Sequence, residues 1–410
     1  MSAPVRWTLV MLAGLDLACG ATRRRVPAIT APQLERRLHA ASGALENAAA
    51  LVPFFEKLSS GTAHILHYGD SHSASDDFPD TLRRQLQARF GVGGPGFTLA
   101  GRPYLGYRRF DSRGSQSAGW RTSGTTTHTS DGVEGLGGVS ITAERTGETA
   151  TLTAECEHLA LLYLQQPGGG DFEFSVDGET VQTVATSGAL EPGYFDYEPV
   201  PGPHRFAVRT LTGGAVRLFG WTADNAGGVT YETLGINGAQ ATVMLGWADE
   251  LLAAHIARRD PALIVVAYGT NEAISPRWDA AAYSVAFRQV LERLRSAAPG
   301  TSILVIGPPD CLFVKQTHRM TSAHLSEVIA IQRAVARESH CAYWNWRARM
   351  GGPGSVRRWA AAGLSQSDYV HMRSSGYRLA GKLLFEELMF HYERFIAAHH
   401  AAGASKENDQ

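Results

Sequence analysis

A short strand pattern that ends in Gly-Asp-Ser constrains the fold of this chain more than any other feature. Residues 63–68 are mostly apolar and have the pattern of a strand, and the tripeptide that ends at Ser71 follows directly. Acidic residues and a proline after Asp76 then mark the beginning of a helix, whose apolar side chains recur every four residues as far as Phe90. The pattern therefore places a serine where a strand turns into a helix, and open α/β sheets bind ligands at such points.

The last third of the chain alternates between apolar runs and segments with helical spacing. Continuous apolar runs such as 262–267 are typical of strands that helices cover on both faces. This alternation predicts an α/β fold with a doubly wound parallel sheet. Strands are predicted at 63–68, 262–267, 302–306 and 341–346. Helices are predicted within 32–58, from 76 to 90, around 245–256, around 283–294, at 322–339, and from Ser374 or Ser375 to about His399.

The middle of the chain, residues 112–225, has little helical periodicity. Short β-type runs separated by turn residues predict an antiparallel β-sandwich inserted into the α/β domain. The alternative, a set of long loops, is less favoured because so long a structureless segment is unusual within a compact domain. The predicted runs are 138–143, 150–154, 160–165, 172–176, 180–186, 204–210 and 215–221.

Length and composition describe an ordinary globular protein. The 410 residues suffice for two domains, and a formal net charge of −1 gives no electrostatic reason to expect nucleic acid or an anionic membrane as partner. No internal stretch approaches the roughly 20 apolar residues of a transmembrane span. Four cysteines are too few for a disulfide scaffold. Cys311 and Cys341 are expected at opposite ends of neighbouring parallel strands, so no bridge between them is predicted.

The amino terminus, residues 1–25, resembles a leader for export. An apolar run from Trp7 to Leu15 precedes Cys19, which fits a degenerate lipoprotein cleavage box. Asp16 and the arginines at 23–25 argue against this interpretation, and a disordered leader is the alternative. Export would place the protein in the periplasm or cell envelope, with a lipid anchor at Cys19 as an option. At the other end, residues 401–410 are predicted to be a disordered tail.

Four sequence blocks resemble, in order, those of the SGNH (GDSL-type) serine hydrolases. They are Gly69-Asp70-Ser71-His72-Ser73, the glycine of Ile236-Asn237-Gly238-Ala239, Tyr268-Gly269-Thr270-Asn271-Glu272 and Asp368-Tyr369-Val370-His371. Glu272 stands where the family usually has aspartate. The resemblance covers about 60–90 and 230–395 and implies a flavodoxin-like α/β domain in two pieces, 26–111 and 226–400, around the insertion at 112–225.

The resemblance implies a role for each block, and the residue types fit those roles. Ser71 would be the nucleophile, His371 its general base and Asp368 the group that orients the imidazole. The backbone amides of Ser71 and Gly238 and the side-chain amide of Asn271 would form an oxyanion hole. Taken singly, Gly238 is equally explained as a turn residue, Asn271 as a helix cap and His371 as a structural histidine.

Four further side chains are weaker candidates for the substrate pocket. His72 would border it, and Tyr268, Trp346 and Trp359 would offer surfaces on which a sugar could stack, although core packing is the alternative for each. No His-x-x-x-His or Cys-x-x-Cys pattern is present, so neither a metal nor another cofactor is expected.

The inserted segment narrows the class of substrates that we expect. A small β-sandwich between the first and second blocks resembles the carbohydrate-binding-like domain of bacterial peptidoglycan O-acetylesterases, and residues 227–238 resemble their re-entry segment. This implies a serine esterase that removes O-acetyl groups from a carbohydrate, such as the cell-wall glycan peptidoglycan. The alternatives are an O-acetyltransferase, a general carboxylesterase or lipase, and a non-catalytic glycan-binding protein.

Overall fold

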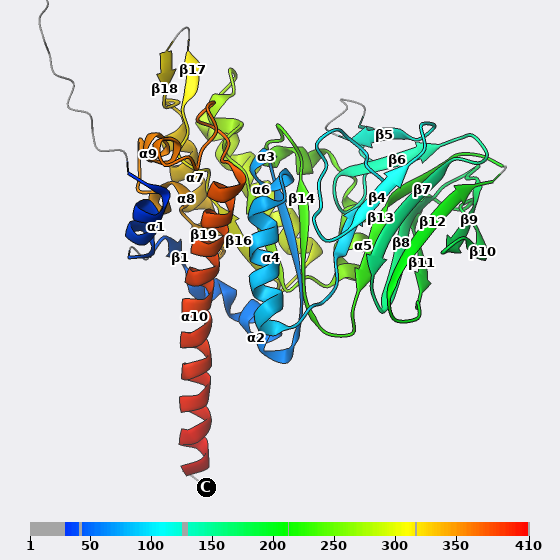
Figure 1. The fold of residues 1–410 in the computed structure, drawn as a ribbon, viewed down its shortest axis with the longest axis horizontal. Helices are drawn as coiled ribbons and strands as arrows, with labels where there is room; N and C mark the ends of the chain where they lie inside the picture. Colours follow the sequence, from blue (N-terminus) through cyan, green and yellow to red (C-terminus); the bar gives the residue numbers. More distant parts are fainter. Residues whose placement is uncertain (1–28, 41–42, 125–129, 212, 316–317, 409–410) are drawn as a thin grey trace, which may run out of the picture.

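The computed structural model describes residues 29–40, 43–124, 130–211, 213–315 and 318–408 (Figure 1). The predicted leader and its Cys19 lie outside this part of the chain. Within it, no helix combines the length and the apolar character needed to cross a membrane.

The α/β part is built on a six-stranded sheet. In spatial order its strands are β1 (Leu45–Glu46), β19 (Ala342–Trp344), β16 (Ser302–Ile306), β15 (Leu263–Ala267), β2 (Thr62–Gly69) and β14 (Gly228–Gly235). The strands from β19 to β14 are parallel, and taken in chain order they have the flavodoxin-like arrangement 2-1-3-4-5. The predicted doubly wound fold is confirmed, with one correction: β1 is antiparallel, so the sheet is mixed.

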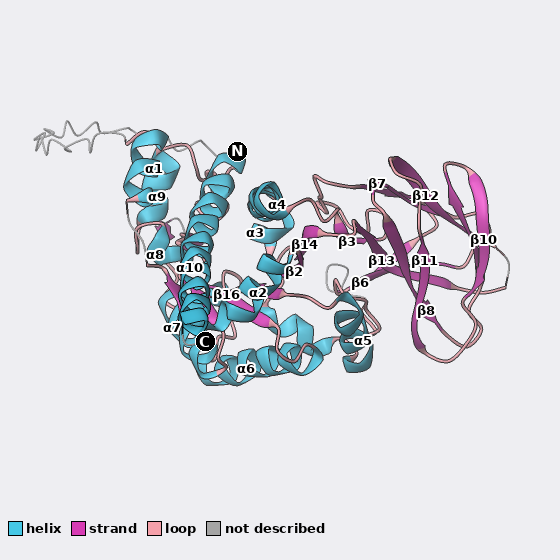
Figure 2. Ribbon diagram, turned by 90° about the horizontal axis from the view of Figure 1, so that it is seen from below, coloured by secondary structure: helices cyan, strands magenta, loops and turns pink. Residues whose placement is uncertain are grey.

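Helices cover both faces of this sheet (Figure 2). One face packs against α1 (Ala31–His39), α2 (Val52–Ser60), α4 (Asp77–Phe90) and α10 (Ser374–Asn408), and the other against α5 (Asp249–Arg259), α6 (Ala280–Ala297) and α7 (Leu325–Glu338). Strand β15 shows why its sequence is uniformly apolar: Leu263 and Val265 join the first core, whereas Ile264 and Val266 join the second. Short helices complete this part: α3 (Ser71–Ala74), α8 (Trp346–Arg349), α9 (Ser355–Ala361), and the 3-10 turns η1 (Ala48–Leu51), η2 (Ala241–Gly246) and η3 (Glu272–Ile274).

Two antiparallel sheets lie beside the α/β part (Figures 1 and 2). The first contains, in order, β10 (Glu179–Ala185), β9 (Asp171–Val176), β12 (Pro203–Thr210), β7 (Thr149–Glu155) and β4 (Arg113–Gln116). The second contains β11 (Glu191–Tyr197), β8 (His158–Gln165), β13 (Val216–Asp224), β6 (Val139–Ala143) and β5 (Arg121–Gly124), with β3 (Gly96–Leu99) paired to β13. Side chains of both sheets, such as Phe174 and Trp221, share one hydrophobic core. A hairpin of β17 (Phe313–Lys315) and β18 (His318–Met320) lies elsewhere in the chain.

The structure corrects several boundaries. Each predicted β-type run lies in a strand, but β3, β4, β5, β11 and β14 were not predicted as strands, and the antiparallel region begins at Gly96 instead of residue 112. Helix α10 continues to Asn408. The prediction of a disordered tail over 401–410 is therefore wrong for residues 401–408. Cys311 and Cys341 are free, buried thiols.

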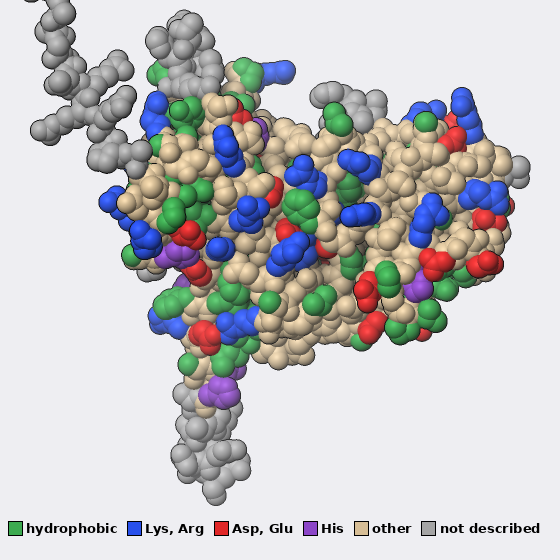
Figure 3. Space-filling view, viewed as in Figure 1, with side chains coloured by type: hydrophobic (Ala, Val, Ile, Leu, Met, Phe, Trp, Pro, Cys, Tyr) green, Lys and Arg blue, Asp and Glu red, His purple; other side chains and the backbone are tan. Residues whose placement is uncertain are grey.

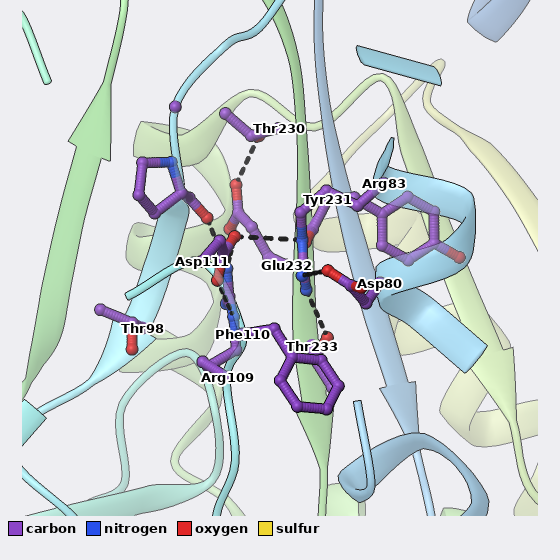
Figure 4. A network of polar contacts seen from close by, with 12 residues as sticks. Asp80, Arg83, Thr98, Arg109, Phe110, Asp111, Thr230, Tyr231, Glu232 and Thr233 are labelled. Carbon is purple, nitrogen blue, oxygen red and sulfur yellow. Dashed lines mark hydrogen bonds and ion pairs between the residues drawn. The ribbon is translucent and has the colours of Figure 1, made fainter. Parts of the chain in front are cut away.

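A buried ionic network joins the two parts of the molecule (Figure 4). The Arg83 guanidinium on α4 is 1% exposed and donates to Asp76 and Asp80, each at 2.8 Å. Its Nε lies 3.1 Å from Asp111, which leads into β4 and also pairs with Arg109 at 2.7 Å. These ion pairs therefore connect the charged residues of α4 to the segment that enters the antiparallel sheets.

Candidate active site

The register of the central strands brings three loops together at one edge of the sheet. Gly69 at the end of β2 pairs with Gly235 of β14 on one side and with Ala267 of β15 on the other. Neighbouring strands lie about 4.8 Å apart, so the loops that follow these three residues begin side by side. Ser71, Gly238 and Asn271 lie two, three and four residues beyond these strand ends.

A hydrogen-bonded chain of three side chains lies at this edge. The Ser71 Oγ is 3.0 Å from His371 Nε2, and His371 Nδ1 is 2.7 Å from Asp368 Oδ2. The other oxygen of Asp368 accepts from the backbone amides of Val370 and His371, at 2.9 and 3.0 Å. The three predicted residues thus meet across 300 positions of sequence, in the order hydroxyl, imidazole, carboxylate.

The carboxylate of Asp368 is held in its charged form. Burial acts to raise its pKa, but the hydrogen bonds from the His371 ring and from two backbone amides outweigh burial and lower the pKa below its usual value. An ionised carboxylate accepts from Nδ1 of the imidazole and thereby favours the neutral tautomer whose Nε2 can accept the proton of Ser71.

Ser71 is the first residue of the one-turn helix α3, which intervenes between β2 and α4. Asp70 caps this turn, because its carboxylate accepts from the His72 amide at 2.9 Å. The first amides of a helix lack an intrahelical acceptor, so the Ser71 amide is available to a ligand. Gly69 permits this tight approach: a Cβ there would lie 2.1 Å from Ser73 Oγ and 2.9 Å from the carbonyl of Ala267.

The loop of Gly238 and the side chain of Asn271 are joined to each other. Gly238 has a φ of 76°, a conformation that favours glycine. The Asn271 side-chain amide donates to the Ala239 carbonyl at 2.9 Å, and Gln240 donates back to the Asn271 carbonyl at 3.3 Å. Asn271 therefore fixes the loop that carries the Gly238 amide, and the second proton of its side-chain amide remains for another acceptor.

The four side chains suggested for the substrate pocket are buried. His72, Tyr268, Trp346 and Trp359 are each at most 3% exposed. The prediction that the last three offer a surface for sugar stacking is therefore wrong, and their packing in the core is the alternative that holds. His72 was predicted to border the pocket, but it is buried too. His72 instead lies behind the triad, with its ring centroid 5.5 Å from that of His371 and its Nδ1 3.0 Å from the Tyr377 hydroxyl. Burial, assisted by the neighbouring His371, lowers the pKa of His72 to about 3, so this imidazole stays neutral.

Two buried carboxyl groups lie beneath the loops. Burial raises the pKa of Asp70 to about 8 and that of Glu272 to about 7. Glu272 accepts from the Ala241 amide at 2.9 Å through one oxygen, and its second oxygen is buried without a hydrogen-bond partner among the described residues. Both groups therefore take up protons on folding and act as supports of the loops.

Replacing Glu272 by glutamine is expected to flatten the pH dependence of stability. The folded-state pKa lies above the usual value of 4.5, so the folded state binds the extra proton and stability falls as the pH rises from about 4.5 through about 7. This loss amounts to up to about 3 kcal/mol in the wild type and is absent from the Glu272→Gln variant.

Thermal unfolding measured between pH 5 and pH 8.5 tests this expectation. The difference in melting temperature, variant minus wild type, should grow with pH. The matched control is Glu250→Gln, since Glu250 is an exposed residue of α5. A difference that stays constant across the range for Glu272→Gln would show that the buried carboxyl titrates normally.

No metal ligands gather in the described residues, where no group of three or more His, Cys, Asp or Glu side chains could hold an ion. The chemistry that this site offers by itself is that of a hydroxyl nucleophile with an adjacent base.

A groove of about 830 Å³ lies in front of Ser71 and His371. Its walls include Gly106 and Arg108, which precede β4, Asn237 from the loop beside Gly238, and the first turns of α10. Its volume lies within the range of about 300–1,000 Å³ that is usual for ligand sites. No sequence pattern identified Gly106 and Arg108, because neither belongs to one of the four blocks and only the fold places them at the groove.

The chain matches the GDSL-like Lipase/Acylhydrolase family over residues 206–379. This match includes the segments with Gly238, Asn271 and Asp368–His371, and the structure adds Ser71, which lies outside it. No protein of curated function matches the sequence significantly.

Solved structures provide further matches. A structure described as "Peptidoglycan O-acetylesterase in action, 5 min" is 28% identical, with a TM-score of 0.74, and the match covers 86% of this chain and 100% of that chain. Family two carbohydrate esterases from Clostridium thermocellum and Cellvibrio japonicus are each 12% identical, with TM-scores of 0.29 and 0.28. These two matches cover 61% and 69% of this chain, and 93% and 98% of those chains.

Proposed function

Since the chain is an SGNH hydrolase and therefore an ester-hydrolysing enzyme, we propose that it removes O-acetyl groups from a cell-wall glycan such as peptidoglycan. The observation that carries the proposal is the hydrogen-bonded chain from Ser71 through His371 to Asp368 at the wall of an open groove. Acyl transfer is the chemistry for which a hydroxyl, a base and an orienting carboxylate in this order are suited.

In the first half of the proposed reaction, Ser71 Oγ attacks the acetyl carbonyl carbon while His371 Nε2 takes the hydroxyl proton. The tetrahedral intermediate collapses when the sugar oxygen leaves, and this oxygen takes the proton from His371. In the second half, His371 takes a proton from water, whose oxygen attacks the acetyl–Ser71 ester. The bond between the acetyl carbon and Ser71 Oγ then breaks, and the proton passes from His371 to Oγ. Acetic acid leaves and ionises to acetate.

The negative oxygen of both tetrahedral intermediates needs hydrogen-bond donors. We assign this role to the amides of Ser71 and Gly238 and to the side chain of Asn271, which follow three adjacent strand ends. One such donor typically contributes roughly 3–4 kcal/mol in the transition state.

Two observations favour hydrolysis of a glycan ester over the alternatives. The side chains of His371 and Asp368 are 36% and 44% exposed, so water reaches the base directly and can act as the acceptor in place of a second sugar. The antiparallel sheets from β3 to β13 fit an inserted β-sandwich that binds carbohydrate, and the peptidoglycan O-acetylesterase structure matches this chain across 86% of its length. Activity on cell-wall glycan would place the protein outside the cytoplasm, in the periplasm or cell envelope.

Acetate release tests the proposal. The purified protein should release acetate from O-acetylated peptidoglycan, from acetylated xylan and from an aryl acetate, with the highest kcat/KM on peptidoglycan. Higher kcat/KM on xylan would overturn the peptidoglycan assignment, and preference for the aryl ester would favour a general esterase. Glycan binding without any acetate release by the folded protein would favour the non-catalytic alternative.

Replacing Asp368 by asparagine is expected to lower kcat roughly 10²- to 10⁴-fold, because an amide does not hold the His371 tautomer that accepts the Ser71 proton. KM should change little, since Asp368 lies behind the imidazole and outside the residues that line the groove. Steady-state kinetics with aryl acetate measure both constants. A kcat within threefold of the wild type would show that this carboxylate does not orient the base.

A further inference from the structure

Arginine side chains dominate the charge of the groove. Arg108, Arg373 and Arg378 line it, and Asp77 is the carboxylate among the described residues that line it. The whole chain has a formal net charge of −1, so this excess of positive charge beside Ser71 is local. Figure 3 shows Lys and Arg side chains, in blue, gathered over α4 and the elements on either side of it.

Asp77 neutralises this charge only in part. It lies 4.0 Å from Arg108 Nη1 and 3.8 Å from Arg378 Nη1, at the outer limit of an ion pair, and also accepts from Ser374 at 3.1 Å. No carboxylate in the described residues forms an ion pair with Arg373. The side chains of Arg108 and Arg378 are 56% and 57% exposed, so their donors are free to bind a ligand.

The arginines come from two separate segments of the chain. Arg108 lies on the segment that enters the antiparallel sheets, whereas Arg373 directly precedes α10 and Arg378 lies in its first turns, shortly after His371. A guanidinium presents paired N–H donors that match the two oxygens of a carboxylate. When a substrate binds with its ester at Ser71, a carboxylate elsewhere on that substrate would therefore accept hydrogen bonds from these guanidinium groups.

We propose that this groove recognises a carboxylate on the acetylated glycan, so that the preferred substrate is an acidic sugar ester. The inference rests on the proposed function and specifies its substrate: the sugar that carries the acetyl group, or its attached substituent, bears a negative charge. Peptidoglycan meets this requirement through the carboxylates of its peptides, or of muramic acid where no peptide is attached, whereas a neutral xylan does not.

A matched pair of substrates isolates the carboxylate. O-acetylated N-acetylmuramic acid and its methyl ester differ in the negative charge and in one methyl group. The wild type should cleave the acid with a kcat/KM roughly five- to tenfold above that of the methyl ester at low ionic strength. This ratio should fall as salt is added, because exposed charges are screened.

Three variants assign the effect to the arginines. In the double variant Arg373→Gln/Arg378→Gln the ratio of kcat/KM, acid over methyl ester, should fall to about one. In Asp77→Asn the ratio should rise, because the competing carboxylate is gone. Arg337→Gln, an exposed arginine of α7 outside the groove, is the control and should keep the wild-type ratio.

Failure of this inference and failure of the proposed function give different results. The inference is overturned if the wild type has equal kcat/KM on the two sugars, or if the double variant keeps the wild-type ratio. In either case, activity on aryl acetate would still support the assignment as an esterase. Absence of cleavage of all three compounds by the folded wild type removes the proposed function and the inference with it.

Discussion

The Ser71→Ala variant is expected to lose esterase activity by a factor of about 10⁴ or more in kcat. The alanine leaves no oxygen to attack the carbonyl, so His371 and Asp368 have no nucleophile to activate. Residual turnover would come only from the oxyanion donors and substrate binding. Acetate release at saturating aryl acetate, compared with the wild type, measures the effect.

The folded state of this variant has to be preserved for the result to bear on mechanism. Ser71 loses only one hydroxyl, so the melting temperature should stay close to that of the wild type. Ser59→Ala, an exposed position on α2, is the matched control and should retain full activity. A folded Ser71→Ala variant with more than a tenth of wild-type kcat would contradict the proposed nucleophile.

Replacing Arg83 by methionine is expected to lower the free energy of unfolding by about 3–5 kcal/mol. The Arg83 guanidinium is buried and contacts Asp76, Asp80 and Asp111. Its removal leaves the buried Asp76 carboxylate without a cation, whereas Asp80 keeps Arg84 and Asp111 keeps Arg109. Because Asp111 leads into β4, the attachment of the antiparallel sheets to α4 should also weaken. Urea denaturation followed by far-UV circular dichroism measures the loss.

The next residue on the same helix provides the control. Arg84 also pairs with Asp80, at 2.7 Å, but its side chain is 70% exposed. Arg84→Met should change the free energy of unfolding by less than about 1 kcal/mol. Equal effects of the two substitutions would show that burial of the Arg83 network does not contribute to stability.

The sequence was sufficient to predict the helices and strands whose pattern of apolar residues reflects burial. Strands β15 and β16 are apolar throughout because helices cover both faces, and α4 repeats its apolar residues because one face packs on the sheet. Because the buried stretch sets the length of such an element, its predicted bounds lie within a few residues of those in the structure. Helix α10 continues past the predicted end near His399 to Asn408, although Gly403 in this segment is typical of a helix end.

The strands missed in the antiparallel region lie mostly at sheet edges. β4 and β5 are four polar residues each, and β11 contains Pro192 and Gly193. Edge strands need neither an apolar face on both sides nor a donor at every residue, so the cues for a strand are weak. Strand β14 differs from these strands because it is buried throughout. Its glycines at both ends and the polar residues Thr230, Glu232 and Thr233 weaken the sequence pattern of a buried strand.

The residues of the site likewise divide into those that the sequence could predict and those that it could not. Ser71, Gly238, Asn271, Asp368 and His371 could be named because each lies in a short motif beside a strand end or a helix start. The arginines of the groove could not, since Arg108 is separated from Arg373 by most of the chain and only the fold places both at one cavity. The predictions of a sugar-stacking role for Tyr268, Trp346 and Trp359 were wrong because residue type and position in the sequence do not reveal burial.

The measurement that tests the central claim most directly is covalent labelling of the serine. A fluorophosphonate should inactivate the wild type with one label per chain, which peptide mapping by mass spectrometry should locate on Ser71. Labelling should be strongly slowed in His371→Ala, because the base 3.0 Å from the hydroxyl is missing. An active protein that stays unlabelled, or that is inactivated by a label on another residue, would contradict the assignment of Ser71 as the activated nucleophile.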